Sequence, residues 1–118
     1  MKRCLLKSKI HRAKVTGADV DYEGSIMIDK DLTEAADILP YERVQVLSVD
    51  SGERLETYAI PGERGSGEVR MNGAAARVIG EGETVIILSY AWLEEEELKD
   101  FKPKIALVSA ENRLLELV

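Results

Sequence analysis

The sequence has few of the residues on which most catalytic and metal sites depend. Its 118 residues include one cysteine, Cys4, and one histidine, His11. A single cysteine permits no internal disulfide, which fits the cytoplasm, and we expect Cys4 to be a buried small apolar residue. These two residues are too few for a zinc site, so we expect no metal. His11 also lacks the Gly-x-Ser-x-Gly motif that would support a Ser-His-Asp triad.

Positive charge and long hydrophobic runs are also scarce. Lys and Arg number 16 against 22 Asp and Glu, which gives a formal net charge of -6. This balance argues against a nucleic-acid binder, whose affinity comes largely from basic residues on phosphates. No apolar run approaches the roughly 20 residues that span a bilayer. Lys7 and Lys9 end the first apolar stretch too soon for a signal peptide, so we expect a cytoplasmic protein without a membrane partner.

The segments that are present predict a mainly β protein with one domain over residues 1–118. Residues 43–60 predict a β-hairpin around a turn at 50–53. The apolar run 84–92 predicts a strand buried on both faces, and residues 104–109 and 113–118 predict two further strands. Many short strands of this kind are typical of a compact closed barrel.

One or two short helices are predicted among these strands. The first would begin after Asp31, which forms a capping-box pattern with Glu34, and Pro40 would end it. Leu39 would be the last residue of its apolar face. A second would begin at Asn72, whose side chain would cap the following amides.

One motif and its context point to a specific chemistry. Tyr22-Glu23-Gly24-Ser25 resembles the self-cleavage site of aspartate 1-decarboxylases. Alone, Gly24-Ser25 would predict only a turn before a strand. Further segments agree with the family in order and spacing: residues 9–12, 18–19, 35–39, 54–60, 63–66 and 72–76. The resemblance runs from the first strand to about Ser89 and is loose after Leu93.

The resemblance implies a double-psi β-barrel that assembles as a cytoplasmic homotetramer, with active sites between neighbouring subunits. It implies that the chain cuts itself into residues 1–24 and 25–118. In the family, the serine Oγ attacks the preceding glycine carbonyl, and the ester eliminates to a dehydroalanine that becomes a pyruvoyl cofactor. Gly24 is expected to admit strained backbone geometry. Some members need a separate protein to accelerate cleavage.

The resemblance also implies the substrate and its contacts. In family members the pyruvoyl group forms a Schiff base with L-aspartate, which loses carbon dioxide and becomes β-alanine for pantothenate and coenzyme A. Tyr58 matches the proton donor, and Thr57 matches a residue used in self-processing and in substrate contact. Arg54 matches the residue that grips a substrate carboxylate through two hydrogen bonds. The segment Asn72-Gly73-Ala74-Ala75 would offer backbone amides to an anion.

Strand geometry constrains these assignments. Lys9 and His11 lie two residues apart on one expected strand, hence on one face, and could add positive charge to the pocket. The resemblance implies Lys9 as a substrate-binding residue, with His11 and Tyr22 as accessory residues. Thr57 and Tyr58 are adjacent on a strand and should point to opposite faces. Both could serve catalysis if they line different sites, if the strand is distorted, or if the active site lies between subunits. Without the family pattern, these residues would be read as ordinary strand and surface residues.

Two other functions stay open on the sequence alone. The chain could be a non-enzymatic small β-barrel regulatory module, which would stay one polypeptide, whereas the enzyme would give two fragments and a hydrazine-reactive carbonyl. It could also be a pyruvoyl decarboxylase of another amino acid, which a comparison of aspartate with glutamate turnover would distinguish.

Overall fold

The computed structural model describes all residues from 1 to 118 and confirms a mainly β protein. Nine strands form one mixed sheet in the order β2-β6-β3-β5-β4-β7-β1-β8-β9. The strands are β1 (Arg3–Lys14), β2 (Gly17–Asp19), β3 (Ser25–Asp29), β4 (Arg43–Ser48), β5 (Arg54–Gly62), β6 (Val69–Asn72), β7 (Thr84–Leu93), β8 (Lys104–Val108) and β9 (Leu114–Leu117). One α-helix, α1 (Lys30–Ala35), and two 3-10 helices, η1 (Gly73–Arg77) and η2 (Glu95–Asp100), complete the chain. None of these helices has the length and hydrophobicity needed to cross a membrane.

The sheet closes into a barrel because β1 leads almost directly into β2. β1 pairs with β7, whereas β2 pairs with β6 at the far end of the strand order. Only Val15 and Thr16 separate the two strands. The Val15 amide donates to the Glu83 carbonyl at 2.9 Å, and the Thr16 amide donates to the Val69 carbonyl at 2.8 Å. These bonds join the two sides of the sheet, as the expected double-psi β-barrel requires.

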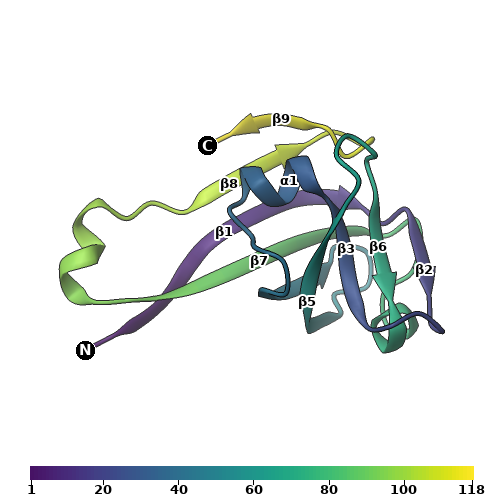
Figure 1. Cartoon of the computed structure of the whole chain (residues 1–118), viewed down its shortest axis with the longest axis horizontal. Helices are drawn as coiled ribbons and strands as arrows, with labels where there is room; N and C mark the ends of the chain where they lie inside the picture. Colours follow the sequence, from purple (N-terminus) through teal and green to yellow (C-terminus); the bar gives the residue numbers. More distant parts are fainter.

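β1 and β7 extend beyond the barrel as a two-stranded arm that carries η2 at its end (Figure 1). Within the barrel, β7 is buried or half-buried up to Ser89, but Tyr90 and Trp92 in the arm are exposed. The prediction of a strand buried on both faces therefore holds only for the first half of β7. Cys4 lies opposite Trp92 in the arm and is exposed, so the prediction of a buried cysteine is wrong.

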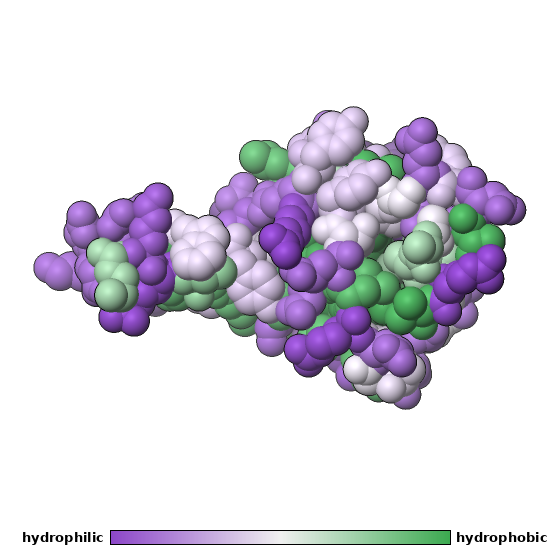
Figure 2. Space-filling view, turned by 90° about the horizontal axis from the view of Figure 1, so that it is seen from below, coloured by the Kyte–Doolittle hydropathy of each residue, from purple (hydrophilic) through white to green (hydrophobic).

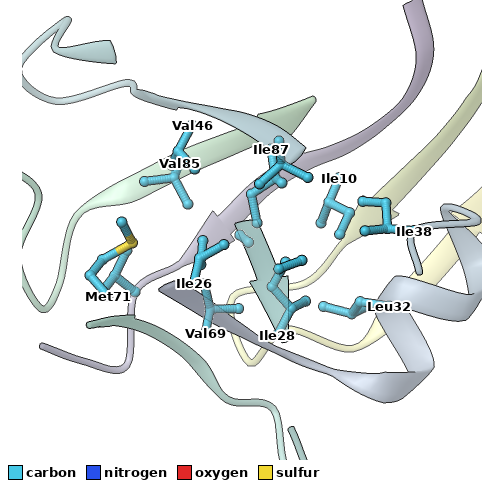
Figure 3. Packing of buried hydrophobic residues seen from close by; sticks show 14 of the residues in the cluster. Ile10, Ile26, Ile28, Leu32, Ile38, Val46, Val69, Met71, Val85 and Ile87 are labelled. Carbon is cyan, nitrogen blue, oxygen red and sulfur yellow. The ribbon is translucent and has the colours of Figure 1, made fainter. Parts of the chain in front are cut away.

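Sixteen buried hydrophobic residues form one core inside the barrel. Figure 3 shows Ile26 and Ile28 of β3 pointing toward Val69, Leu32 and their neighbours. Because β3 lies between β5 and β6, four of its five residues are buried. Burial of each isoleucine contributes about 1.5–3 kcal/mol. The strand that begins with Ser25 is thus firmly held.

The helix after β3 differs from its prediction in both of its ends. Its N-cap is Asp29, whose carboxylate accepts from the Asp31 amide at 2.8 Å, so Asp31 is not the cap. The helix ends at Ala35, and Asp37 has a left-handed φ of 55°. Pro40 therefore does not end it, and Leu39 is exposed. The predicted hairpin is confirmed as β4 and β5, and the two C-terminal strands are confirmed as β8 and β9.

Candidate active site

Ser25 is a buried hydroxyl with one side-chain partner. It begins β3 and lies opposite Asn72, the last residue of β6. Both residues are 2% exposed. The Asn72 side-chain nitrogen donates to Ser25 Oγ at 3.1 Å. The prediction that Asn72 caps η1 is therefore wrong, since its side chain makes no cap hydrogen bond and instead orients the serine.

The backbone before Ser25 lies directly against Gly73. Gly73 has a φ of 71°, which L side chains rarely adopt. A Cβ added to Gly73 would lie 2.7 Å from Gly24 Cα, 2.9 Å from Gly24 N and 3.1 Å from the Tyr22 carbonyl oxygen. Gly24 itself is outside the positive-φ region, and a Cβ added there would have no atom within 4 Å. The conformational need for glycine thus lies at residue 73, not at residue 24 as the sequence predicted.

A pocket of about 300 Å³ opens beside Gly24. Its lining comes from the residue before β3, from β5, from the end of β6, and from η1 and the residue after it. It comprises Gly24, Leu55, Glu56, Thr57, Asn72, Ala74, Ala75 and Val78. Figure 1 places these segments at the lower end of the barrel. Figure 2 looks at the molecule from that side and shows hydrophobic residues gathered on the body, bordered by hydrophilic ones. The pocket brings together five of the predicted site residues, Gly24, Thr57, Asn72, Ala74 and Ala75.

Thr57 and Tyr58 have different surroundings, as strand alternation predicted. Thr57 is half-buried and lines the pocket beside Gly24. The ring of Tyr58 instead packs against Tyr41, with ring centroids 6.1 Å apart, and is 37% exposed. β5 shows no bulge here, because its pairing with β4 is continuous from Arg54 to Tyr58. Of the three alternatives weighed from the sequence, a distorted strand is therefore excluded.

The predicted basic residues lie outside this pocket. Arg54 is exposed at the start of β5. Lys9 is half-buried on β1, between β7 and β8. His11 lines a separate pocket of about 290 Å³ with Arg12 and Lys14. Within one chain, none of the predicted basic residues lines the pocket beside Gly24.

Asp29, at the other end of β3, is a buried carboxylate that sequence analysis missed as a structural residue. Its oxygens accept from the backbone amides of Asp31, Gly65 and Gly67 at 2.8–3.0 Å. Burial alone would raise the pKa of Asp29, but these three hydrogen bonds and the charge of Arg113 lower the pKa below its ordinary value. Asp29 therefore binds the start of α1 to the loop between β5 and β6.

Comparisons with known proteins agree with the motif and its setting. The family model described as aspartate decarboxylase matches residues 1–115. An aspartate 1-decarboxylase of Thermoanaerobacter pseudethanolicus is 56% identical over 113 residues, which cover 96% of this chain and 97% of the relative. That of Syntrophus aciditrophicus is 55% identical over 97% of this chain and 98% of its own length. That of Staphylococcus aureus strain JH9 is 48% identical over all of this chain and 93% of its own length.

Proposed function

Because the chain belongs to the aspartate decarboxylase family, we propose that it cuts itself at Gly24-Ser25 and decarboxylates L-aspartate to β-alanine and carbon dioxide. The product serves pantothenate and coenzyme A synthesis. The observation that carries this proposal is the buried Ser25 Oγ, which accepts a hydrogen bond from Asn72. Asn72 lines a pocket beside Gly24 that Thr57 also lines. A non-enzymatic regulatory barrel has no comparable support, since the matched relatives are decarboxylases over nearly their whole length.

Self-cleavage begins with an N-to-O acyl shift, an isomerisation that neither adds nor removes atoms. Ser25 Oγ attacks the Gly24 carbonyl carbon, the peptide C–N bond breaks, and the nitrogen takes the hydroxyl proton. The chain is then linked through an ester, with a free amine on residue 25. Asn72 supports the attack because its amide holds Oγ in place. The Thr57 hydroxyl, which lies in the same pocket as Gly24, would stabilise the oxyanion.

The second stage breaks the Ser25 Cβ–Oγ bond. Loss of the Cα proton expels Gly24 as a carboxylate, which retains Oγ, and residue 25 becomes dehydroalanine. Water then adds at Cα and ammonia departs, which leaves a pyruvoyl ketone at the start of the 25–118 chain. The Asn72 amide assists again, because it donates to the oxygen that leaves. This accounts for serine and asparagine as a buried pair.

The residues around Ser25 fit a pyruvoyl group and a small amino acid. The ketone would supply an electrophile for the substrate amine and an electron sink during loss of carbon dioxide. Ala74 and Ala75 line the pocket through small side chains, so a substrate carboxylate can approach the amides of residues 73–75 closely. This contact would supplement the salt bridge between a substrate carboxylate and Arg54 rather than replace it.

The remaining site residues reach Ser25 from a neighbouring subunit in a homotetramer. Arg54 and Tyr58 lie on the exposed face of β5, opposite Thr57, and Lys9 lies on another strand. A second copy placed over the pocket would bring a carboxylate-binding Arg54, the acid Tyr58 and the charge of Lys9 to the substrate, with His11 and Tyr22 as accessory residues. Tyr22 is 53% exposed and available for such a contact. We place the assembly in the cytoplasm. A separate protein that accelerates cleavage is compatible with this scheme but is not required by it.

Turnover assays test the substrate assignment. Purified processed protein is incubated with L-aspartate or L-glutamate, and the amine products are quantified per pyruvoyl group. We expect β-alanine from aspartate and little product from glutamate, whose longer side chain displaces the distal carboxylate from its guanidinium partner. Faster turnover of glutamate would identify a different substrate. Ser25→Ala is the matched control and should have no activity.

A further inference from the structure

We propose that Gly73 is a positioning residue for self-cleavage, because its lack of a side chain lets the scissile Gly24 lie within reach of Ser25 Oγ. The inference rests on the proposed function and adds to it a role in the precursor, before any substrate binds. It is carried by the contact between the two glycines, in which a Cβ on Gly73 would meet Gly24 Cα at 2.7 Å and Gly24 N at 2.9 Å.

The nucleophile and the glycine contact belong to one rigid unit. Ser25 is fixed by its pairing with Asn72, by burial and by the hydrogen bond to its Oγ. Gly73 directly follows Asn72 in the chain. Two adjacent residues, the last of β6 and the first of η1, therefore hold the two reacting partners, Asn72 the hydroxyl and Gly73 the backbone that carries the carbonyl. Any shift of Gly24 relative to β6 changes the distance over which the attack must occur.

A side chain on Gly73 would displace the carbonyl but not the hydroxyl. The three atoms that it would meet are all backbone atoms, two of Gly24 and the carbonyl oxygen of Tyr22. They cannot rotate away as a flexible side chain can. To reach ordinary contact at 3.4 Å, Gly24 Cα would have to move by at least 0.7 Å from its 2.7 Å position. A misplacement of about 1 Å in a reacting pair can slow a reaction by about a hundredfold.

Two other glycines separate this contact from the effect of backbone conformation. Gly52 and Gly82 have φ of 78° and 92°, close to the 71° of Gly73, but a Cβ on either would meet no atom within 4 Å. Replacement of any of the three by alanine puts a side chain on a left-handed residue, at a comparable cost. Only Gly73→Ala also places a side-chain atom against the backbone of Gly24.

The experiment follows self-cleavage by mass spectrometry in freshly purified wild type, Gly73→Ala, Gly52→Ala and Gly82→Ala, without substrate. A role of Gly73 in substrate binding cannot affect this readout. We expect the two control variants to cleave at the wild-type rate and Gly73→Ala to cleave about a hundredfold more slowly. Its melting temperature should fall further than those of the controls, because only this variant adds a backbone clash to the strain of positive φ, but it should stay folded at the assay temperature. Cleavage of Gly73→Ala within threefold of the controls would overturn the proposal.

A second variant covers the case in which Gly73→Ala folds poorly. Asparagine tolerates positive φ better than alanine does but has the same Cβ. Gly73→Asn should therefore fold and still cleave slowly if the contact matters, whereas near-wild-type cleavage would assign the effect to backbone strain and overturn the proposal. A wild type that never cleaves would overturn the proposed function itself, and is recognised because the control variants would then be uncleaved too.

Discussion

At the scale of single residues, we propose that two neighbours on β5 act at different stages. Thr57 lines the pocket with Gly24, and Tyr58 packs outside it against Tyr41. We expect Thr57→Val to accumulate uncleaved precursor, because it keeps the shape and loses the hydroxyl that is proposed to stabilise the oxyanion. Tyr58→Phe should cleave normally but turn over about 10²–10⁴-fold more slowly, as expected for loss of a general acid. Mass spectra and β-alanine production per pyruvoyl group measure the two effects separately.

The opposite pattern would contradict these roles. Wild-type cleavage of Thr57→Val would remove Thr57 from the processing step. Failure of Tyr58→Phe to cleave would show that Tyr58 acts before the cofactor exists.

Arg54 provides a second residue-scale prediction. It is exposed, so its proposed partner is the substrate in a neighbouring subunit's pocket. Arg54→Lys keeps the charge but loses the pair of parallel hydrogen bonds. A loss of 2–3 kcal/mol of transition-state binding corresponds to a drop in kcat/KM of roughly a hundredfold. Steady-state kinetics on the fully processed variant measure this, and near-wild-type kinetics would remove Arg54 from the site.

At the scale of elements, Asp29 joins α1 to the loop between β5 and β6. We expect Asp29→Asn to lower the free energy of unfolding at pH 7 by about 1.5–3 kcal/mol, since hydrogen bonds to a charged acceptor are weakened. Urea denaturation measures the loss. Asp100→Asn is a suitable control, because Asp100 is an exposed residue of η2. Equal stability of the two variants would contradict the role of Asp29.

The lowered pKa of Asp29 predicts how this stability depends on pH. The folded state binds the proton less tightly than the unfolded state, whose aspartate pKa is about 3.9. The stabilisation is therefore complete above about pH 5 and is lost as the pH falls through the lower folded-state pKa. The difference in stability between wild type and Asp29→Asn should shrink in that acidic range. A constant difference from pH 7 down to pH 3 would contradict the prediction.

The sequence predicted the elements better than their ends. Alternation and turn residues located the β4–β5 hairpin because both signals are local. The end of α1 was misplaced because the left-handed Asp37 stops the helix before Pro40 can. The sequence favours a helix cap at Asn72 because that role is common for asparagine, whereas its hydrogen-bond partner Ser25 is 47 residues away in the chain. No pattern among neighbouring residues predicts a hydrogen bond between residues so far apart in the chain.

The same limit applies to the candidate site. The motif predicted Gly24 and Ser25 as site residues, but the need for glycine at residue 73 depends on how closely the start of η1 approaches the segment before β3. Spacing along the sequence could not show this approach, because it arises from the pairing of β3 with β6. Conversely, the opposite orientations of Thr57 and Tyr58 followed from strand geometry alone and were predicted correctly.

At the scale of the whole molecule, the absence of Arg54 from the pocket beside Gly24 predicts that active sites form between subunits. Co-expression of Ser25→Ala with Arg54→Ala chains tests this, since each is inactive alone. In mixed assemblies, a site can combine an intact Ser25 from one chain with an intact Arg54 from its neighbour. With random mixing we expect about a quarter of wild-type activity, because each residue is intact with a probability of about one half. No activity in mixed assemblies would place both residues in the same subunit.

The most direct test of the central claim is the intact mass of the purified protein. Conversion of Ser25 to a pyruvoyl group takes up one water and releases one ammonia, so the fragments 1–24 and 25–118 should together weigh about 1 Da more than the precursor. The second fragment should also react with a hydrazine, and Ser25→Ala should stay one chain. Fragments that together weigh about 18 Da more would show plain peptide hydrolysis. That result, or a wild type that stays uncleaved, would contradict the account.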